Sequence, residues 1–394
     1  MSKSGMRVAV VGAGIAGLTV AAALRKTGVQ CRVYERAPRL AEIGAGIQLS
    51  PNATSLLARL GIAGELRSVA VRPEAIEMHR WDSGDLLMRT VLGQTCEDLF
   101  GAPYYCLHRA DLHSLLVDLL PAGVLRLDAH CVSVTDGDDG AEIRFADGSV
   151  ETADVVVGAD GIRSVVRETL VSDEPRFAGQ TIYRGLISAD LLPQLLKEPK
   201  VLIWLGPGQH CVCYPISAGR SISFVATTPA AEWRTESWTE NGRIADVTEA
   251  YQGWNGEVQA LLSNATTVTR WALHDRAPID HWSGRRVTLV GDAAHPMLPF
   301  GAQGANQAIE DAVALAACLR DVRPADLPQA LWRYEAVRRP RTEYVQQAIQ
   351  KNARNHHFAD GEDQRDRDRT MDENWGLRGQ EWLFGYDAEL AVTQ

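Results

Sequence analysis

A glycine-rich turn near the N-terminus constrains the fold more than any other feature of the chain. Residues 6–11 form a short apolar run rich in β-branched residues, and the pattern Gly12-x-Gly14-x-x-Gly17 follows at once. Such a run predicts a buried parallel strand, and the helix predicted over 15–27 would start with free backbone amides. We expect Gly12 to allow the tight turn, Gly14 to let the backbone approach a pyrophosphate, and Gly17 to let the helix pack on the strand.

A second predicted strand and its terminal acid complete this pattern. The strand covers 31–34 and ends at Glu35, 18 residues after Gly17. A carboxylate at this point can accept hydrogen bonds from both hydroxyls of an adenosine ribose, and it would repel a 2′-phosphate. A glycine-rich turn without a ligand is the alternative, but strand, glycines, helix, strand and acid in this order favour a dinucleotide site.

Length and charge exclude several classes of protein. The chain has 394 residues, enough for two joined domains, and a net charge of −10. This charge argues against nucleic acids and anionic membranes as partners, because their phosphates would be repelled. There is no run of eighteen apolar residues and no signal peptide, so we expect a cytoplasmic monomer or homodimer. Seven cysteines are scattered without metal-ligand spacing, which predicts reduced thiols and no metal site.

Two later strand ends resemble the first one. The run 155–157 ends in Gly158-Ala159-Asp160-Gly161, and the run 287–290 ends in Gly291-Asp292-Ala-Ala-His295-Pro296. Before them, the alternating residues 124–157, cut by Asp-Gly turns at 136–137 and 147–148, predict a β-meander. Between them, the alternating pattern over 177–273 predicts further strands. One ligand site must therefore be assembled from both ends of the chain, which predicts interleaved rather than sequential domains.

The expected fold class is α/β, with a Rossmann-type domain interleaved with a mostly β domain and followed by C-terminal helices. We expect the first domain to comprise 1–175 and 275–350, the β domain 176–274, and a helical tail 351–394. Apolar stripes predict helices over 307–319 and 327–349. The charge-dense stretch 358–374 is expected to be a mobile surface link, and the aromatic residues 382–386 are expected to dock.

Taken together, the motifs Gly12-x-Gly14-x-x-Gly17, Gly-Ala-Asp160-Gly161-Ile-Arg-Ser and Gly291-Asp292-Ala-Ala-His295-Pro296 resemble a known family. It is the single-component FAD-dependent aromatic hydroxylases of the para-hydroxybenzoate hydroxylase fold. The chain is most similar to the branch of salicylate hydroxylase, 3-hydroxybenzoate 6-hydroxylase and 6-hydroxynicotinate 3-monooxygenase, over nearly its whole length. The resemblance implies a GR2-like FAD-binding domain, FAD as cofactor, and NADH or NADPH as co-substrate with O₂.

The resemblance also implies which residues meet the cofactor. Arg109 would neutralise the phosphate linker, although a surface salt bridge is the alternative. Asp292 would accept a ribityl hydroxyl or merely cap a turn, and the amides of Gly304, Ala305 and Asn306 would stabilise negative charge on the reduced flavin. Asp160 would serve both cofactors beside Arg163 and Arg167, or cap a helix, and both readings stay open. The ADP half would be held by Gly12, Gly14, Gly17 and Glu35, and the cofactor would also be bound by Ala16, Arg36 and Gly46.

On the substrate side, a histidine and a tyrosine four apart resemble the catalytic pair of the hydroxybenzoate 6-hydroxylases. His210 and Tyr214 would share one face of a strand, and a histidine near its own pKa can take the proton of a phenol. A half-buried histidine satisfied by backbone is the alternative. Gln48, Arg184 and Pro299 are expected to line the site. Gln48 is the residue of salicylate hydroxylases, whereas 6-hydroxynicotinate enzymes carry histidine at this place.

These residues and the resemblance predict an NAD(P)H-dependent FAD monooxygenase. It would hydroxylate a small phenolic or amino- or hydroxy-substituted aromatic acid through a C4a-hydroperoxyflavin. Two alternatives remain: an oxygenase that modifies a larger phenolic natural product, and a flavin-binding protein of the same fold without catalysis.

Overall fold

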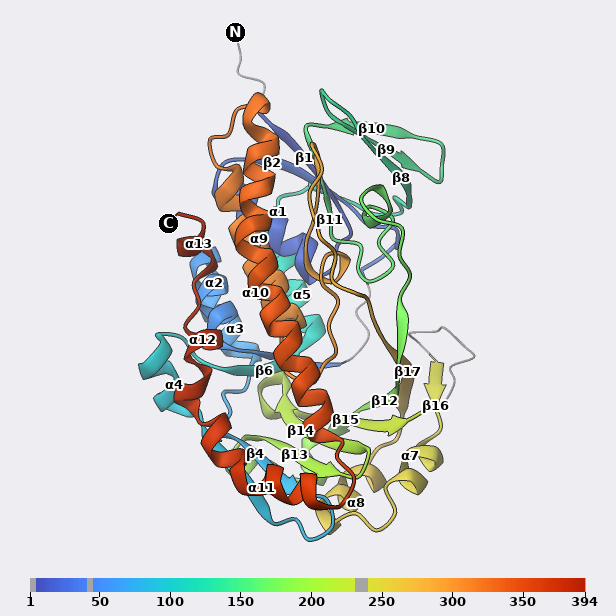
Figure 1. Cartoon of the computed structure of the whole chain (residues 1–394), viewed down its shortest axis with the longest axis vertical. Coiled ribbons are helices and arrows are strands. Elements are labelled where there is room, and N and C mark those ends of the chain that lie inside the picture. Colours follow the sequence, from blue (N-terminus) through green and yellow to red (C-terminus); the bar gives the residue numbers. More distant parts are fainter. Residues whose placement is uncertain (1–4, 41–44, 231–239, 394) are drawn as a thin grey trace.

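Two large sheets lie at opposite ends of an elongated molecule (Figure 1). The computed structural model describes residues 5–40, 45–230 and 240–393. One long helix, α10 (Leu327–His356), runs along the long axis from one sheet to the other. The N-terminal glycine motif belongs to the first sheet, so α10 connects that region to the second sheet.

The first sheet has five parallel strands in the order β18-β11-β1-β2-β7. All residues of β11 and β18 are buried, as expected for parallel strands with both faces covered. Since β18 lies two positions from β1, the two chain ends meet in one sheet, as the sequence predicts. The strands are β1 (Arg7–Val11), β2 (Gln30–Tyr34), β7 (Leu125–Arg126), β11 (Val155–Gly158) and β18 (Val287–Leu289).

Helices surround this first sheet, and two of them start near the glycine motif. Helix α1 begins directly after Gly14, and α9 packs against it although it lies almost 300 residues later. Near the sheet are α1 (Ile15–Lys26), α2 (Pro51–Leu60), α3 (Ala63–Val69), α5 (Arg109–Asp118) and α9 (Gly304–Leu319). The predicted meander follows as β8 (Cys131–Asp136), β9 (Ala141–Phe145) and β10 (Val150–Ala153), which pair antiparallel.

The second sheet has eight strands in the order β16-β17-β12-β15-β14-β13-β4-β5. It extends beyond the range 176–274 expected for it, because β4 pairs in parallel with β13 and brings β5 with it. A local strand pattern does not say which sheet a strand joins. The strands are β4 (Ala75–Arg80), β5 (Leu86–Val91), β12 (Arg176–Ser188), β13 (Lys200–Gly206), β14 (Gln209–Ile216), β15 (Ser221–Pro229), β16 (Glu240–Gly242) and β17 (Val268–Asp275).

The two faces of this sheet meet different partners. On β14, Cys211 and Cys213 pack with the face covered by α7 (Ile244–Ala250) and α8 (Gly256–Ser263). Tyr214 and Val212 belong to the opposite face, which packs with residues of α10 and of the C-terminal segment. Because side chains alternate along a strand, His210 shares this second face. The remaining elements are β3 (Gly46–Leu49), α4 (Gly93–Phe100), β6 (Tyr105–His108) and α6 (Gln194–Lys197).

The C-terminal segment wraps back along α10 as three helices (Figure 1). They are α11 (Glu362–Trp375), α12 (Glu381–Phe384) and α13 (Ala388–Ala391). The expectation of a mobile link over 358–374 is wrong: α11 packs against β5, and Gln364, Arg367 and Met371 are buried. The docking of 382–386 is confirmed, since Leu383 and Phe384 are buried in the core.

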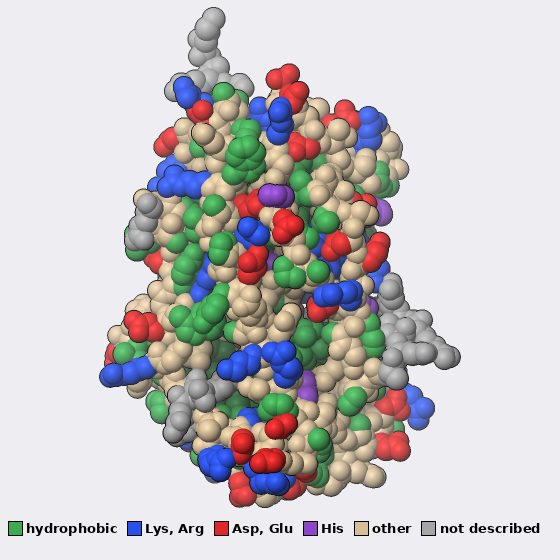
Figure 2. Space-filling view, in the orientation of Figure 1, with side chains coloured by type: hydrophobic (Ala, Val, Ile, Leu, Met, Phe, Trp, Pro, Cys, Tyr) green, Lys and Arg blue, Asp and Glu red, His purple; other side chains and the backbone are tan. Residues whose placement is uncertain are grey.

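The described residues contain no group of three or more side chains that could hold a metal ion, and their seven cysteines are free thiols. No described helix is both long and apolar enough to span a membrane. Basic and acidic side chains are intermixed over the face seen in Figure 2.

Candidate active site

The turn after β1 is shaped by two glycines and leaves the third one open. Gly12 has φ +103°, and a Cβ there would lie 2.4 Å from the Ala159 carbonyl oxygen. At Gly17 a Cβ would lie 2.0 Å from the carbonyl oxygen of Gly12. No atom lies within 4 Å of a Cβ built on Gly14, and α1 starts there with no capping side chain and no acid in its first turn. The amides of α1 therefore face open space, which favours an anion.

Glu35 lies at the end of β2 beside this turn. Its carboxylate accepts hydrogen bonds from the backbone N–H groups of Ala13 (2.8 Å) and Ala37 (2.9 Å). These bonds hold the side chain at the turn and leave further lone pairs for hydroxyl donors. Arg36 is exposed.

A second uncapped helix start faces the same region. Helix α9 begins at Gly304 without a capping side chain or an acid in its first turn. Gly291 is wedged between α1 and α9, because a Cβ there would lie 3.1 Å from Ala16 Cβ and 3.2 Å from Ala308 Cβ. The next residue, Asp292, lies with Oδ1 4.0 Å from a Cβ built on Gly304. The two helix starts and Asp292 thus converge.

The surroundings of Asp292 indicate a recess open to solvent, called the cleft below. Solvent reaches its side chain, yet desolvation by the surrounding protein raises its pKa, and the charges of His295 and Arg109 act in the opposite direction. Arg109 is the first residue of α5, and its backbone N–H donates to the Ala45 carbonyl (2.8 Å). The end of β18 and the start of α5 therefore bring the charged groups Asp292 and Arg109 close enough to interact.

The side chain of Asn306 links this helix start to β3. It accepts a hydrogen bond from the Ser50 backbone N–H (2.9 Å) and donates to the carbonyls of Gln48 (3.1 Å) and Ala302 (2.6 Å). His295 is buried as well and lies with Nε2 2.5 Å from Asp311 Oδ2. The Asn306 amide and Nε2 of His295 are engaged within the protein, which leaves the backbone amides at the start of α9 to meet a ligand.

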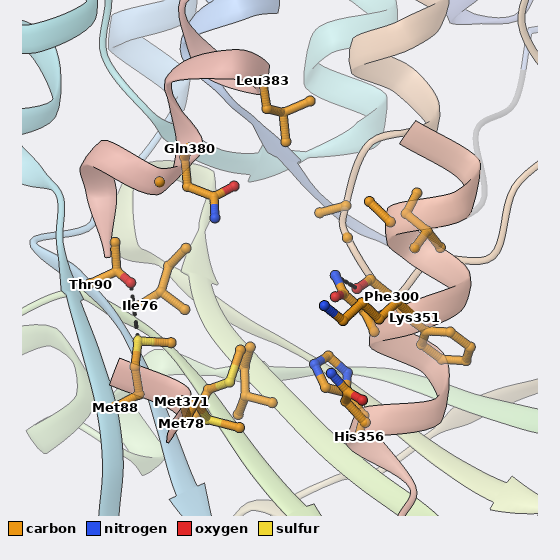
Figure 3. A pocket seen from close by; sticks show the side chains of 18 of the residues that line it. Ile76, Met78, Met88, Thr90, Phe300, Lys351, His356, Met371, Gln380 and Leu383 are labelled. Carbon is orange, nitrogen blue, oxygen red and sulfur yellow. Dashed lines mark hydrogen bonds between the residues drawn. The ribbon is translucent and has the colours of Figure 1, made fainter. Parts of the chain in front are cut away.

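A cavity of about 840 Å³ lies between the second sheet and the C-terminal helices (Figure 3). Figure 3 shows Met78, Met88 and Met371 together on one side and Lys351 and His356 of α10 on another. The segment 299–303, which leads into α9, also lines it, so the cavity reaches the helix start that faces the cleft. The expected substrate residues Gln48 and Pro299 are among its lining residues.

His210 lines this cavity and is buried. Its Nδ1 lies 2.8 Å from Nε2 of His357 and 3.2 Å from Oγ1 of Thr227. Burial and the charges of His357 and His356 hold the pKa of His210 well below its usual value. The imidazole is therefore neutral at pH 7 and keeps one nitrogen lone pair. The sequence led us to expect a pKa near neutrality, whereas the pKa of His210 is well below it.

Tyr214 shares the sheet face with His210 but is not among the residues that line the cavity. It packs against Gly46, where a Cβ would lie 2.7 Å from Tyr214 Cε2. Burial raises the pKa of Tyr214 to about 12, while Arg184 and hydrogen bonds from Gln48 and Ser223 act in the opposite direction. The tyrosine is thus a neutral hydroxyl between the cavity wall and β3.

Arg184 is not among the residues that line this cavity. Its guanidinium stacks on Trp271, 4.5 Å from the ring centroid. Burial lowers the pKa of Arg184; the charge of Tyr214 acts against this effect and that of Arg109 acts with it. Among the described residues, its buried Nε has no hydrogen-bond partner, which marks a donor that a ligand can satisfy.

Asp160 makes the contacts of a capping residue, one of the two roles left open by the sequence. Its carboxylate accepts hydrogen bonds from the Ser164 hydroxyl (2.5 Å) and the Val165 backbone N–H (2.8 Å). Arg167 is buried and paired with Asp173 (2.8 Å). Both side chains are engaged within the protein.

The family is decided by comparison with known proteins. Residues 5–349 match the family model described as FAD binding domain. The chain belongs to this FAD-binding family. The resemblance seen in the sequence is thereby confirmed, and FAD is the cofactor.

Relatives match the chain over its length. A 3-amino-4-hydroxybenzoate 2-monooxygenase of Streptomyces platensis (PtmB3) is 48% identical, with 98% of both chains covered. A 6-hydroxynicotinate 3-monooxygenase of Pseudomonas fluorescens is 35% identical, covering 97% of this chain and 95% of that one. The structure of a salicylate hydroxylase substrate complex has a TM-score of 0.85 at 29% identity, covering 100% of this chain and 98% of that one. This FAD-binding chain is therefore similar to aromatic monooxygenases throughout.

The residues of the cleft fit FAD. The open space at Gly14 suits a pyrophosphate, the accessible carboxylate of Asp292 suits a hydroxyl, and the orphaned Nε of Arg184 suits an acceptor. Sequence reasoning missed three residues that shape the cavity: Tyr104, whose hydroxyl donates to Gln48 Oε1 (2.7 Å), Lys351 and His357. None of these three residues belongs to a sequence motif. Tyr104 lies next to β6, and Lys351 and His357 lie on or directly after α10, so the placement of these two elements brings them to the cavity.

Proposed function

We propose that this chain is an FAD-dependent monooxygenase that uses NADH or NADPH and O₂ to hydroxylate a small aromatic acid with a hydroxyl or amino group. The observation that supports the proposal is that one segment of the chain joins the cavity to the cleft. The cavity that contains neutral His210 is closed on one side by residues 299–303, which lead directly into the α9 start at the cleft. Cofactor and substrate would therefore meet at this segment.

The proposed cofactor contacts follow from the cleft. The start of α1 at Gly14 would hold the pyrophosphate, Glu35 the adenosine ribose, and Asp292 a ribityl hydroxyl. Arg109 would balance phosphate charge, and the first amides of α9 would stabilise negative charge on the flavin edge. Gly12, Ala16, Gly17 and Gly46 would keep the backbone close to the ligand. When bound and reduced, FAD supplies with O₂ the electrophilic oxygen for hydroxylation.

The cavity supplies what an electrophilic oxygen needs from its partner. A phenol becomes a strong nucleophile when its hydroxyl proton is taken, and His210 has a neutral imidazole to accept it. The His210 ring lies edge to face with Phe300, 5.3 Å between centroids, so the ring plane is held. Apolar walls at Ile76, Val201 and Val212 would keep water away from the reacting carbon.

The similarity to a 3-amino-4-hydroxybenzoate enzyme suggests the first substrate to try. An acid of this kind needs a cation for its carboxylate. Arg367 and Arg369 at the cavity are paired with Asp368 and Asp366, whereas Lys351 projects into the cavity (Figure 3). We therefore assign the carboxylate to Lys351 in place of Arg184.

A substrate panel tests the proposed function. FAD-loaded protein is mixed with NADH or NADPH and either small amino- or hydroxybenzoates or larger polycyclic phenols. We expect a small acid to stimulate NAD(P)H oxidation and to gain one atom of ¹⁸O from ¹⁸O₂. Hydroxylation of polycyclic phenols alone would favour an oxygenase of larger natural products. No hydroxylation with any compound, despite bound FAD, would leave a non-catalytic flavoprotein.

Lys351→Met tests the carboxylate assignment. We expect KM for the acid to rise about tenfold, equivalent to about 1.4 kcal/mol, with kcat little changed, because a ground-state contact is lost. The carboxamide analogue should bind equally to both proteins. Lys197→Met, at an exposed lysine on α6, is the matched control and should behave as wild type. An unchanged KM in Lys351→Met would contradict the assignment.

A further inference from the structure

A hydrogen bond joins the cavity histidine to the far end of α10. Nδ1 of His210 on β14 lies 2.8 Å from Nε2 of His357, which directly follows α10. The two residues are 147 positions apart in the chain. His357 is half-buried and its ring also contacts Phe300 at the cavity, so the pair is held within the protein.

This bond leaves one defined nitrogen of His210 for a ligand. Thr227 Oγ1 lies 3.2 Å from the same Nδ1 and accepts from the His210 backbone N–H (2.9 Å). The Tyr251 hydroxyl donates to the His210 carbonyl (2.6 Å), so backbone and ring are both restrained. With Nδ1 engaged on the protein side, Nε2 is the nitrogen that remains for the cavity.

The direction of the bond decides what Nε2 can do. If His357 accepts, His210 carries its proton on Nδ1 and presents a lone pair at Nε2; if His357 donates, His210 presents an N–H. The Ala353 carbonyl, one turn earlier in α10, can only accept, and it acts on the His357 ring to raise its pKa against the effect of burial. Gln180 Nε2 lies 3.1 Å from Nδ1 of His357, and Gln180 Oε1 has no hydrogen-bond partner among the described residues. Turning this amide by 180° would place the unpartnered oxygen at Nδ1 as an acceptor. A proton on Nδ1 of His357 satisfies the carbonyl and makes Nε2 of His357 an acceptor.

We propose that His357 is a positioning residue: it accepts the Nδ1 proton of His210 and thereby holds the Nε2 lone pair of His210 toward the aromatic substrate. The inference rests on the proposed function. In the step it serves, the substrate O–H bond breaks, its proton forms an N–H bond at Nε2, and the substrate is left as the phenolate. The resulting imidazolium keeps its Nδ1–H bond to His357.

Two further titratable or charged side chains, His356 and Arg367, act on this histidine pair. His356 lies 5.4 Å from the His210 ring, centroid to centroid, and Arg367 on α11 acts on both His356 and His357 by its charge. Arg367 is paired with Asp368 (2.6 Å). None of these groups is altered by a substitution at position 357, so the pair can be tested separately.

The test compares a substitution that keeps a hydrogen-bond acceptor at position 357 with one that removes it. In His357→Gln the side-chain oxygen can still accept the Nδ1 proton, whereas in His357→Phe no acceptor remains. The readout is the apparent pKa of bound 4-hydroxy-3-nitrobenzoate, followed by its visible absorbance on FAD-loaded protein. We expect His357→Phe to raise this ligand pKa by about 1 unit and to lower kcat at least tenfold with KM little changed. His357→Gln should stay within about 0.3 units of wild type.

Every outcome of this comparison is decisive. Equal impairment in both variants would overturn the proposal, because the imidazole itself would be required to carry the proton. Wild-type behaviour of His357→Phe would also overturn it. If His357→Phe does not load FAD, His357→Met replaces it, and exposed Arg354→Ala at the same helix end is the control. The ligand titration needs binding but no turnover, so it distinguishes failure here from failure of the proposed function.

Discussion

The cofactor cleft and the cavity are built in opposite ways. In the cleft, backbone groups at the starts of α1 and α9 face the space that a ligand would fill, assisted by Glu35 and Asp292. In the cavity, side chains do this, and they come from β4, β5, β13 and β14 and from α10 to α12. The cofactor cleft depends on close approach of the backbone to the ligand. The cavity depends on which side chains project into it from distant elements.

This difference explains why the cofactor cleft produces a recognisable sequence motif and the cavity does not. Backbone approach requires glycine where a Cβ would collide, as at Gly12 and Gly17, so the requirement appears as a short motif. A cavity side chain such as Lys351 needs only a helix at the right place and rotation. Substitutions in the cleft should therefore affect stability and FAD binding, and those in the cavity should affect turnover.

The largest effect is expected at the cavity. His210→Ala should lower kcat by about 10² to 10⁴, because the acceptor of the substrate proton is lost. FAD content and substrate KM should change little, and part of the loss should be recovered at high pH, where the substrate hydroxyl ionises unaided. Product formation measured between pH 6 and 10 checks this. Unchanged turnover would remove the histidine from the reaction.

A matched pair of glycine substitutions tests the cleft. Gly17→Ala should lower the free energy of unfolding by about 1–3 kcal/mol or more, since its Cβ would lie 2.0 Å from a carbonyl oxygen. Gly14→Ala should leave the FAD-free protein as stable as wild type, because the space is open, but should weaken FAD binding at least tenfold. Urea unfolding and flavin fluorescence titration measure both. If the two variants behaved alike, Gly14 would have no ligand role.

The buried histidines predict a pH dependence of stability. Burial lowers the pKa of His356 to about 3 and of His357 to about 4, and that of His210 is lowered as well. Below pH 6.5 the unfolded chain takes up protons that the folded chain does not. The free energy of unfolding should therefore fall from pH 6.5 toward pH 4, by about 1.4 kcal/mol per pH unit for each histidine.

Asp292 and Asp160 have the opposite effect on the free energy of unfolding. Desolvation raises their pKa values, so the stability that they contribute at low pH is lost as the pH rises. A single substitution isolates the histidine effect. His356→Phe should flatten the slope by about one proton, whereas His130→Asn, at an exposed histidine, should leave it unchanged. Urea midpoints at several pH values decide, and an unaltered slope in His356→Phe would contradict the assignment.

The smallest effect is expected at the rim of the cavity. The Trp382 ring lies edge to face with Tyr344, 4.7 Å between centroids, and 5.5 Å from the Arg341 guanidinium. Trp382→Ala should cost less than about 1 kcal/mol of stability but admit water, so that about two- to fivefold more NAD(P)H is consumed per product. The ratio of product to NAD(P)H measures this. A ratio equal to wild type would show that the rim does not exclude water.

Much of the fold could be read from local patterns. The β1–α1–β2 unit, the meander and the presence of β18 in the same sheet as β1 follow from apolar runs that end in glycine or aspartate. The sheet that β4 and β5 join could not be read, because strand pairing is not local. The stretch 358–374 was misjudged because high charge was taken as disorder, although Met371 and Arg367 bury one face of α11.

The candidate site divides in the same way. The predictions for Gly12, Gly14, Glu35 and Asp292 came from motifs, because a dinucleotide imposes its own spacing on the residues that bind it. Arg184 was expected at the substrate; its guanidinium stacks on Trp271, and its role at the substrate stays a prediction. A strand pattern predicts which face of the sheet a side chain occupies. It does not predict which other parts of the protein pack against that face.

Local sequence was sufficient for the cofactor and the architecture around it, because steric limits on the backbone act within a few residues of each glycine. The cavity and the His210–His357 pair depended on the folded chain. They arise where α10, 30 residues long, carries its C-terminal end across to β14, and no short segment encodes that contact. Packing between distant elements sets the distances of such a pair, and packing is a property of the whole fold.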